Sequence, residues 1–282
     1  MEHLIGTTKT AIIIAASVLS FVPIFLWGYH FYKKHPEKQA YVVITFLAGA
    51  LSVVPLLVYK FLWAYFPWIN AFLWTRNLHA DILGFSTFSL VPISIIATFM
   101  LVGVIEETSK MVSVRLMDVK IFKSIDDVIE FAIIAALGFA FIENIIYFYN
   151  IINVRGFEQL LFPFVFRSLF STFAHVMFSG IFGYFYGVAH FANQELRDEM
   201  QKNRHPIIKF FHKHFHLKRS VLFKDEKILE GLIIASVLHA FFNIFLEMEW
   251  SFLIIPFLFA GYSMLNYLLH KKECLKEYGK IV

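Results

Sequence analysis

The chain is almost free of cysteine: Cys274 is the only one among its 282 residues. A single cysteine can form neither an intramolecular disulfide nor a cysteine-based metal cage. A disulfide-stabilised domain and a structural zinc site built from cysteines are therefore both excluded.

Charged residues are also few. Charged residues make up 16% of the chain, against about a quarter in soluble domains, while apolar residues make up 59%. The aromatic content is high, with 35 Phe, 12 Tyr and 5 Trp. A soluble domain of this length cannot bury so much apolar surface, so the sequence predicts an integral membrane protein. There is no internal repeat and no low-complexity tract, and we expect one integral membrane domain over residues 1–282.

Seven stretches are apolar and long enough to cross a hydrocarbon core of ~30 Å, which needs roughly 20 residues of helix. They are residues 10–32, 41–65, 92–117, 128–150, 168–191, 228–247 and 250–270. Residues 66–91 mix polar and apolar side chains and are expected to form an interfacial or looped segment. We therefore predict an all-α fold, a polytopic membrane helix bundle with about seven transmembrane helices.

Seven spans place the termini on opposite sides of the membrane, and the positive-inside rule decides which side is the cytoplasm. Of the 25 Lys and Arg residues, 20 fall in the loops of one side and the C-terminal tail. The other side receives Lys9, Lys60, Arg76, Arg155 and Arg167. The pattern predicts an external N-terminus and a cytoplasmic C-terminus.

The longest polar segment is the loop at residues 192–227, which contains nine of the basic residues. It also holds four histidines whose spacing matches no strong metal-ligand template: His205, His212, His214 and His216. We interpret it as a cytoplasmic basic loop near anionic lipid headgroups, and we expect no nucleic-acid partner.

Ionisable side chains at membrane depth are costly, and they indicate function by default. The first group is Glu106-Glu107-x-x-Lys110, at the end of an apolar run. Glu106 and Lys110 lie four residues apart and share a helix face, and the second carboxylate exceeds what one ion pair needs. The second group is Glu143, which is followed by Asn144 and flanked by apolar residues within its span.

The other two groups contain histidine. His175 is followed at steps of four by Ser179, Gly183 and Gly187, whose small size permits close helix packing. His239 and Asn243 lie four residues apart in an otherwise apolar span, so they point in the same direction.

These side chains lie at matching depths. Glu143, His175 and His239 are seven or eight residues from the predicted outer ends of their spans, or roughly 10–12 Å at 1.5 Å per residue. Glu106 lies deeper by this count unless its helix begins later. Packing of these helices would bring two Glu, two His and Asn243 to one pocket, within a motif-bearing core of about residues 92–247.

A further acidic group has a structural explanation. Asp127-x-x-Glu130 is typical of a capping box at the start of the fourth span, where the helix dipole favours negative charge. We therefore exclude Asp126, Asp127 and Glu130 from the site.

Two hydrolytic mechanisms fit the pocket. In one, Glu143, His175 and His239 bind Zn²⁺, and Glu106 or Glu107 deprotonates the activated water; two His and one Glu with an open position form an accepted catalytic set.

The other mechanism uses no metal. A glutamate activates water directly, and histidine together with Asn243 stabilises the oxyanion. The residues alone leave both mechanisms open.

Four motifs, in this order on successive spans, resemble the PrsW family of intramembrane proteases, a relative of the CAAX prenyl endopeptidases and of the scaffold subunit of gamma-secretase. They are Glu106-Glu107-x-x-Lys110, Phe139-x-x-x-Glu143-Asn144, His175 and His239-x-x-x-Asn243. The resemblance covers roughly half of the chain.

The resemblance implies a membrane-embedded peptidase. It places the acid–base positions on Glu106 and Glu107, and the other active-site or metal positions on Glu143, His175 and His239. Bacterial members are linked to cleavage of a membrane-anchored anti-sigma factor, so the partners implied are such a substrate and the lipid bilayer. The CAAX branch typically has His in place of Glu143, which disfavours prenyl-protein processing.

Our leading hypothesis is thus a metallo- or glutamic-type protease in a bacterial plasma membrane, acting in or near the transmembrane segment of an anchored protein. The alternatives are a seven-span zinc-dependent lipid amidase, a transporter or proton pathway, and a catalytically silent scaffold. A lipid amidase would be expected to have Ser or Asp near the histidines, where this chain has mainly glutamate. The sequence shows no paired, broken helices of the kind found in transporters. The full set of Glu, His and Asn residues argues against a catalytically silent scaffold.

Overall fold

The computed structural model describes residues 2–34, 38–70, 91, 93–192, 218–273 and 275, and all regular structure in these ranges is helical. The α-helices are α1 (Glu2–Lys34), α2 (Gln39–Leu51), α3 (Val54–Leu62), α5 (Ile93–Ile121), α6 (Ile125–Arg155), α7 (Leu161–Phe166), α8 (Thr172–Phe191), α11 (Arg219–Glu247) and α12 (Ser251–Glu273). The short turns are η2 (Pro67–Ile69), η4 (Phe157–Gln159) and η5 (Arg167–Ser171).

Several features singled out in the sequence lie outside the described residues. Residues 193–217 comprise most of the basic loop with its four histidines, and residues 71–90 comprise most of the mixed segment after the second predicted span. Cys274 also lies outside.

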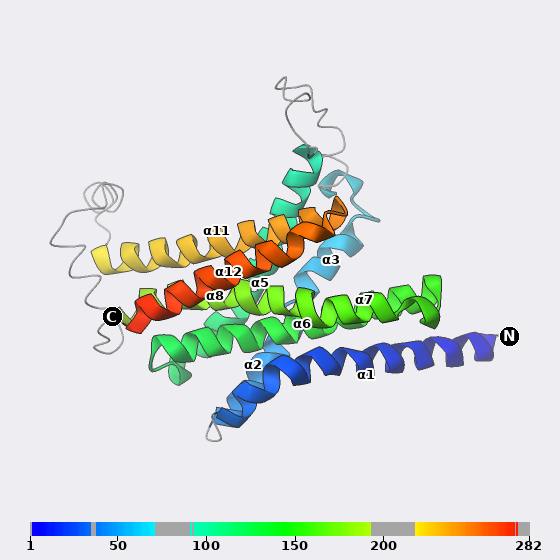
Figure 1. Cartoon of the computed structure of the whole chain (residues 1–282), viewed down its shortest axis with the longest axis horizontal. Helices are drawn as coiled ribbons and strands as arrows, with labels where there is room; N and C mark the ends of the chain where they lie inside the picture. Colours follow the sequence, from blue (N-terminus) through cyan, green and yellow to red (C-terminus); the bar gives the residue numbers. More distant parts are fainter. Residues whose placement is uncertain are drawn as a thin grey trace.

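The described residues contain six helical segments long and apolar enough to cross a membrane, and these correspond to six of the seven predicted spans. The remaining one, α5, has 29 residues but carries Glu106, Glu107 and Lys110 in its middle. The all-α, multi-pass architecture is confirmed. In Figure 1, α1 begins at one end of the long axis and α12 ends at the other. Which end faces the cytoplasm stays a prediction.

Helix α8 occupies the centre of the bundle and packs against α6, α11 and α12. Helix α6 packs in turn against α1 and α2, whereas α5 packs mainly against α11 (Figure 1). In the apolar stretch of α6, 67% of the residues are buried, against only 17% in that of α1. The peripheral helices thus present apolar side chains outward, and the core contains the ionisable residues that were predicted to form the site.

Small residues allow the central helices to approach closely. A Cβ on Gly183 would lie 2.8 Å from the Cα of Ile129, and one on Gly187 would lie 2.7 Å from a methyl carbon of Ile125. The predicted groove along α8 is therefore confirmed, and it holds the first half of α6. This packing fixes the relative positions of Glu143 on α6 and His175 on α8.

The second predicted span, residues 41–65, is interrupted where α2 ends and α3 begins. Pro55 occupies the first turn of α3 and has no N–H for a helical bond to Leu51. At the same junction, the Ser52 hydroxyl donates to the carbonyl of Gly49, at 2.6 Å.

The start of α6 differs from the predicted capping box by three residues. Ser124 is the N-cap, and its hydroxyl accepts the N–H of Asp127 at 3.2 Å. The Asp127 carboxylate accepts the N–H of Lys123 at 2.9 Å and pairs with Lys38 at 2.5 Å, and the neighbouring Asp126 pairs with Lys272 of α12. These acids act structurally, by tying the α1–α2 connection and α12 to the start of α6.

The helix that contains His175 begins earlier than residue 168. Helix α7 runs into the π-helical turn η5 and then into α8 without a break in the chain direction. A π turn adds one residue to the helical repeat and re-aims its side chains, and such turns are frequent at functional sites. Here it turns Arg167 inward, where it is only 8% exposed. The prediction that Arg167 belongs to an outer loop was therefore wrong.

Candidate active site

Five of the six predicted site residues meet in the core of the bundle. Glu106 and Glu107 come from α5, Glu143 from α6, His175 from α8 and His239 from α11. The side chains other than Glu143 are between 2% and 5% exposed, whereas that of Glu143 is 32% exposed. The cluster is thus nearly closed to its surroundings and opens mainly at Glu143.

The centre of the cluster is Glu107. Its Oε1 atom lies 2.7 Å from Nδ1 of His239 and accepts a hydrogen bond of 2.7 Å from Nζ of Lys110. Nε2 of the same histidine lies 3.3 Å from Oε2 of Glu106. The sequence spacing places Glu106 and Lys110 on one helix face, but the structure pairs Lys110 with Glu107, at i and i+3.

Lys110 also connects α5 to α8. Its Nζ lies 2.9 Å from Nδ1 of His175, and Nε2 of that ring lies 2.9 Å from Oε2 of Glu143. An ammonium can only donate, so Nδ1 is the acceptor and the neutral ring donates from Nε2 to the carboxylate. The Phe139 ring packs against His175 at 5.6 Å and beneath the Lys110 ammonium at 4.5 Å, which fixes both groups.

Arg167 extends the network beyond the residues that sequence reasoning found. Its Nη2 pairs with Oε2 of Glu143 at 2.7 Å, and its Nε donates to Oδ1 of Asn144 at 2.7 Å. Asn144 in turn donates to Thr172 at 3.3 Å, and the Thr172 hydroxyl donates to the carbonyl of Arg167 at 2.9 Å. One feature of the sequence could have indicated that Arg167 belongs to the site: it lies two helical turns before His175, directly after an apolar run.

The close approach of α5 to α11 depends on Gly103, one turn before Glu107. A Cβ at this position would lie 2.7 Å from the carbonyl oxygen of Ser236 and 3.4 Å from the amide nitrogen of Ala240. These two α11 residues flank His239, so the missing side chain brings the carboxylate of Glu107 within reach of the imidazole.

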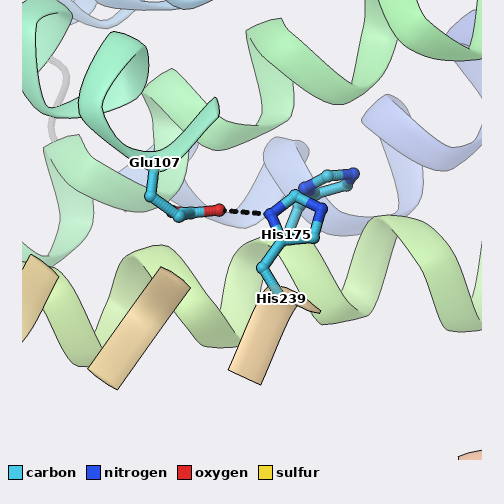
Figure 2. Close-up of side chains that lie close together, drawn as sticks. All are labelled: Glu107, His175 and His239. Carbon is cyan, nitrogen blue, oxygen red and sulfur yellow. Dashed lines mark hydrogen bonds and ion pairs between the residues drawn. The ribbon is translucent and has the colours of Figure 1, made fainter. Parts of the chain in front are cut away.

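Three of the clustered residues could hold a metal ion. Glu107, His175 and His239 each offer a ligand atom, and these atoms lie within 4.8 Å of one another. Figure 2 shows Glu107 pointing from α5 toward the two imidazole rings, whose centroids are 5.1 Å apart at 82°. From the sequence we predicted Glu143 as the third ligand. In the structure Glu143 contacts His175 and Arg167, and it is Glu107 that lies close to both histidines.

The model of one protein family, described as PrsW family intramembrane metalloprotease, matches residues 37–268. The chain belongs to this PrsW family. No curated protein and no solved structure matches it. Family membership makes the chain a membrane-embedded hydrolase that acts on membrane proteins, as the four motifs predicted. The transporter, lipid-amidase and silent-scaffold alternatives are set aside.

The buried charges of the PrsW site do not balance. Glu106, Glu107 and Glu143 face two fixed cations, Lys110 and Arg167. With neutral imidazoles this leaves one uncompensated negative charge in a low-dielectric region, which is unfavourable without a further cation or proton. The donor set and its net charge therefore both suit a bound metal ion.

Asn243, the sixth predicted residue, lies one turn beyond His239. It lines a cavity of about 360 Å³ together with Arg167 and residues of α5, α6, α7, α11 and α12. The structure thus places Asn243 beside the PrsW network rather than within it, at the opening near Arg167.

Proposed function

We propose that the protein hydrolyses a peptide bond in or next to the transmembrane segment of a membrane-anchored protein, at the point where α5, α6, α8 and α11 meet. One observation carries the proposal. Two imidazoles and a carboxylate converge from three helices, and the second carboxylate, that of Glu106, lies 3.3 Å from Nε2 of His239. Ligands and a separate base side by side are what metal-assisted hydrolysis requires.

As the cofactor we propose Zn²⁺, held by Glu107, His175 and His239. Two His and one Glu with an open position are an accepted catalytic zinc set. Glu107 rather than Glu143 belongs to this set because the ligand atoms of Glu107, His175 and His239 all lie within 4.8 Å of one another. A bound zinc ion would supply Lewis acidity, which activates water near neutral pH.

The chain's own groups would then complete the chemistry. Among the described residues, Oε2 of Glu106 is buried without a hydrogen-bond partner, so its lone pairs can accept a proton from the attacking water. Glu143, held by Arg167 and His175, would orient the His175 ring. Asn243 lies at the edge of the adjacent cavity, where its amide could donate to the developing oxyanion.

The substrate we propose is a protein with one transmembrane helix that reaches the site laterally and unwinds locally, because a helical peptide bond is shielded from water. An anti-sigma factor in a bacterial plasma membrane fits this description. The metal-free mechanism, in which a glutamate acts alone, shares this substrate and differs in its dependence on zinc.

The test compares membranes containing the wild-type chain with membranes containing Glu106→Gln, which keeps the shape but cannot accept the proton. New protein N-termini in the two samples are quantified by mass spectrometry. Fragments formed inside apolar segments are expected to fall by about 100-fold or more, the usual range for loss of a general base. The matched control is Glu130→Gln, which replaces a buried glutamate outside the site, on α6 rather than α5. This variant should cleave at the wild-type rate.

Equal fragment patterns from wild type and Glu106→Gln would refute the proposed base. Zinc measured on the purified protein separates the two mechanisms. Retained zinc in wild type, with loss in His239→Ala, is expected for the metalloprotease. Full activity of a zinc-free preparation would establish the glutamic mechanism instead.

A further inference from the structure

The cavity beside Asn243 lies at the end of the bundle that contains α7, where α6 and α11 end and α12 begins. Its volume of about 360 Å³ falls within the size range of ligand pockets. Aromatic and apolar side chains form most of its wall, and a few polar groups project into it. The lining residues are Phe99, Tyr147, Phe162, Pro163, Phe166, Arg167, Asn243, Leu246, Glu247 and Ser251.

The cavity is the next layer above the buried network on the same helix faces. Tyr147 follows Glu143 by one turn on α6, and Asn243 follows His239 by one turn on α11. Phe99 precedes Glu106 by two turns on α5. A group bound in the cavity therefore lies about one helical turn from Glu143 and His239.

Arg167 joins the two layers. Its guanidinium pairs with Glu143, lies 4.5 Å from the Tyr147 ring and lines the cavity. Arg167 and Asn243 thus offer N–H donors beside apolar walls. This combination suits an unwound peptide, whose backbone carbonyls need donors and whose side chains are apolar.

The mouth of the cavity carries negative charge. Glu247 is the last residue of α11 and is exposed, and Ser251 opens α12 beside it. A carboxylate at the rim favours a cation outside the apolar segment of a ligand. Where lysine or arginine occurs near the end of a transmembrane segment, its long side chain extends to the interface and can pair with such a carboxylate.

We propose that this cavity binds the unwound end of the substrate's transmembrane segment, with apolar side chains on the aromatic wall, backbone carbonyls on Arg167 and Asn243, and a basic flanking residue at Glu247. The proposal rests on the proposed protease function and names its substrate subsite. A lipid chain is the less suitable occupant, because it offers no acceptor to the amide of Asn243 or to the N–H groups of Arg167 that do not already bond to Glu143 and Asn144. The larger cavity of about 480 Å³ between α1, α2 and α6 suits a lipid chain better, since apolar side chains and two tyrosines line it.

The test uses the single native cysteine to advantage. Cys274→Ser gives a cysteine-free background, in which Phe162→Cys reports on the cavity and Phe252→Cys is its control. The two phenylalanines are 76% and 74% exposed and lie at the same end of the bundle, but only Phe162 lines the cavity. Each cysteine receives a benzophenone label, and Leu246→Cys is the second cavity position in case Phe162→Cys fails to fold.

The probe is a synthetic peptide with an apolar segment of about 20 residues and lysines at both ends. The labelled protein also carries Glu106→Gln, so that the peptide is not consumed. Illumination in phospholipid vesicles is expected to crosslink the peptide at least fivefold more from positions 162 and 246 than from position 252. Equal yields, or a lipid adduct at position 162 that excess peptide does not displace, would overturn the proposal.

A charge exchange tests the rim. Glu247→Lys is expected to shift the preference from lysine-flanked to glutamate-flanked peptide by about twofold to fivefold, the size typical of a partly exposed ion pair. Glu273→Lys, at the opposite end of α12, should leave the preference unchanged. An identical shift in both variants, or none in either, contradicts the role of Glu247.

Binding measured in the Glu106→Gln background does not depend on hydrolysis. Loss of cavity crosslinking therefore counts against the subsite alone. Retained crosslinking, together with unchanged fragment patterns in the earlier comparison of wild type and Glu106→Gln, counts against the protease mechanism alone.

Discussion

Lys110 is the residue whose charge most directly opposes metal binding. Its ammonium lies 2.7 Å from Glu107 and 2.9 Å from His175, so it uses lone pairs on two of the three candidate ligands. A divalent ion at these ligands would meet both competition for the lone pairs and repulsion from a fixed positive charge. The lysine in turn prevents the cluster of carboxylates from destabilising the metal-free fold.

Replacement of this lysine separates the two effects. Lys110→Met is expected to raise zinc affinity by about tenfold or more, because the repulsion and the competing hydrogen bonds are lost. The metal-free variant should be less stable by about 3–5 kcal/mol, because Glu107 is left as an uncompensated buried charge. Competition with a fluorescent chelator measures the affinity, and thermal unfolding measures the stability.

The control is Lys227→Met, which removes a lysine from an ion pair with Glu230 that has the same i and i+3 spacing on α11. Its zinc affinity should equal that of the wild type. A Lys110→Met protein that binds zinc more weakly would show instead that the lysine supports the metal site.

The identities of the clustered residues were predictable from the sequence, because ionisable side chains are rarely tolerated at membrane depth without a role. Which of these residues contact one another was not predictable. Glu106 and Glu107 differ by about 100° around the helix axis, and the rotation of α5 that turns Glu107 toward both histidines depends on its contact with α11. Arg167 escaped prediction because a cation after an apolar run normally marks the membrane boundary, and the π turn that buries it has no reliable sequence signal.

At the scale of elements, the contact between α5 and α11 governs the site. Gly103→Ala would place a methyl group 2.7 Å from the carbonyl oxygen of Ser236, in a space bounded by backbone rather than by a mobile side chain. The helices must separate, and the expected loss of stability is about 1–3 kcal/mol. Zinc affinity should fall at the same time, because Glu107 moves away from His239. Thermal unfolding and the chelator assay measure the two effects.

Gly28→Ala is the matched control, since its methyl group would meet side-chain methyl groups rather than backbone, those of Leu137 at 3.3 Å and Ile24 at 3.9 Å. Helix propensity favours alanine there, so stability should be unchanged or slightly higher. Equal behaviour of the two variants in both assays would mean that close approach at Gly103 does not position Glu107.

The hydropathy pattern predicted which membrane-spanning helices exist better than it predicted the residues at which they begin and end. Pro55 shows why, because one missing N–H divides an apolar run into α2 and α3 although the run remains long enough to span the membrane. Helix α11 begins at Arg219, nine residues before the predicted start, because its first two turns extend the helix with polar residues that hydropathy does not count.

At the scale of the whole molecule, the candidate ligands come from three helices that are distant in sequence. Glu107, His175 and His239 belong to α5, α8 and α11, and α8 is the helix at the centre of the bundle. At one end, the pairs of Lys38 with Asp127 and Lys272 with Asp126 join the start of α2 and the end of α12 to the start of α6. An ion bound by the three ligands would therefore crosslink the centre of the bundle, whereas these two ion pairs connect helices at its end.

Zinc binding should consequently stabilise the folded bundle as a unit. A ligand that binds the native state alone adds about 2.7 kcal/mol to the free energy of unfolding at 100 times its dissociation constant. The midpoint of thermal unfolding in detergent should rise with zinc and return after chelation. In His239→Ala the rise should vanish, whereas His190→Ala, which removes an α8 histidine that bonds to the Tyr186 carbonyl at 2.9 Å, should keep it. A rise that persists in His239→Ala would place the stabilising zinc elsewhere, and no rise in the wild type would favour the metal-free mechanism, in which Glu107 and Lys110 remain paired throughout the reaction.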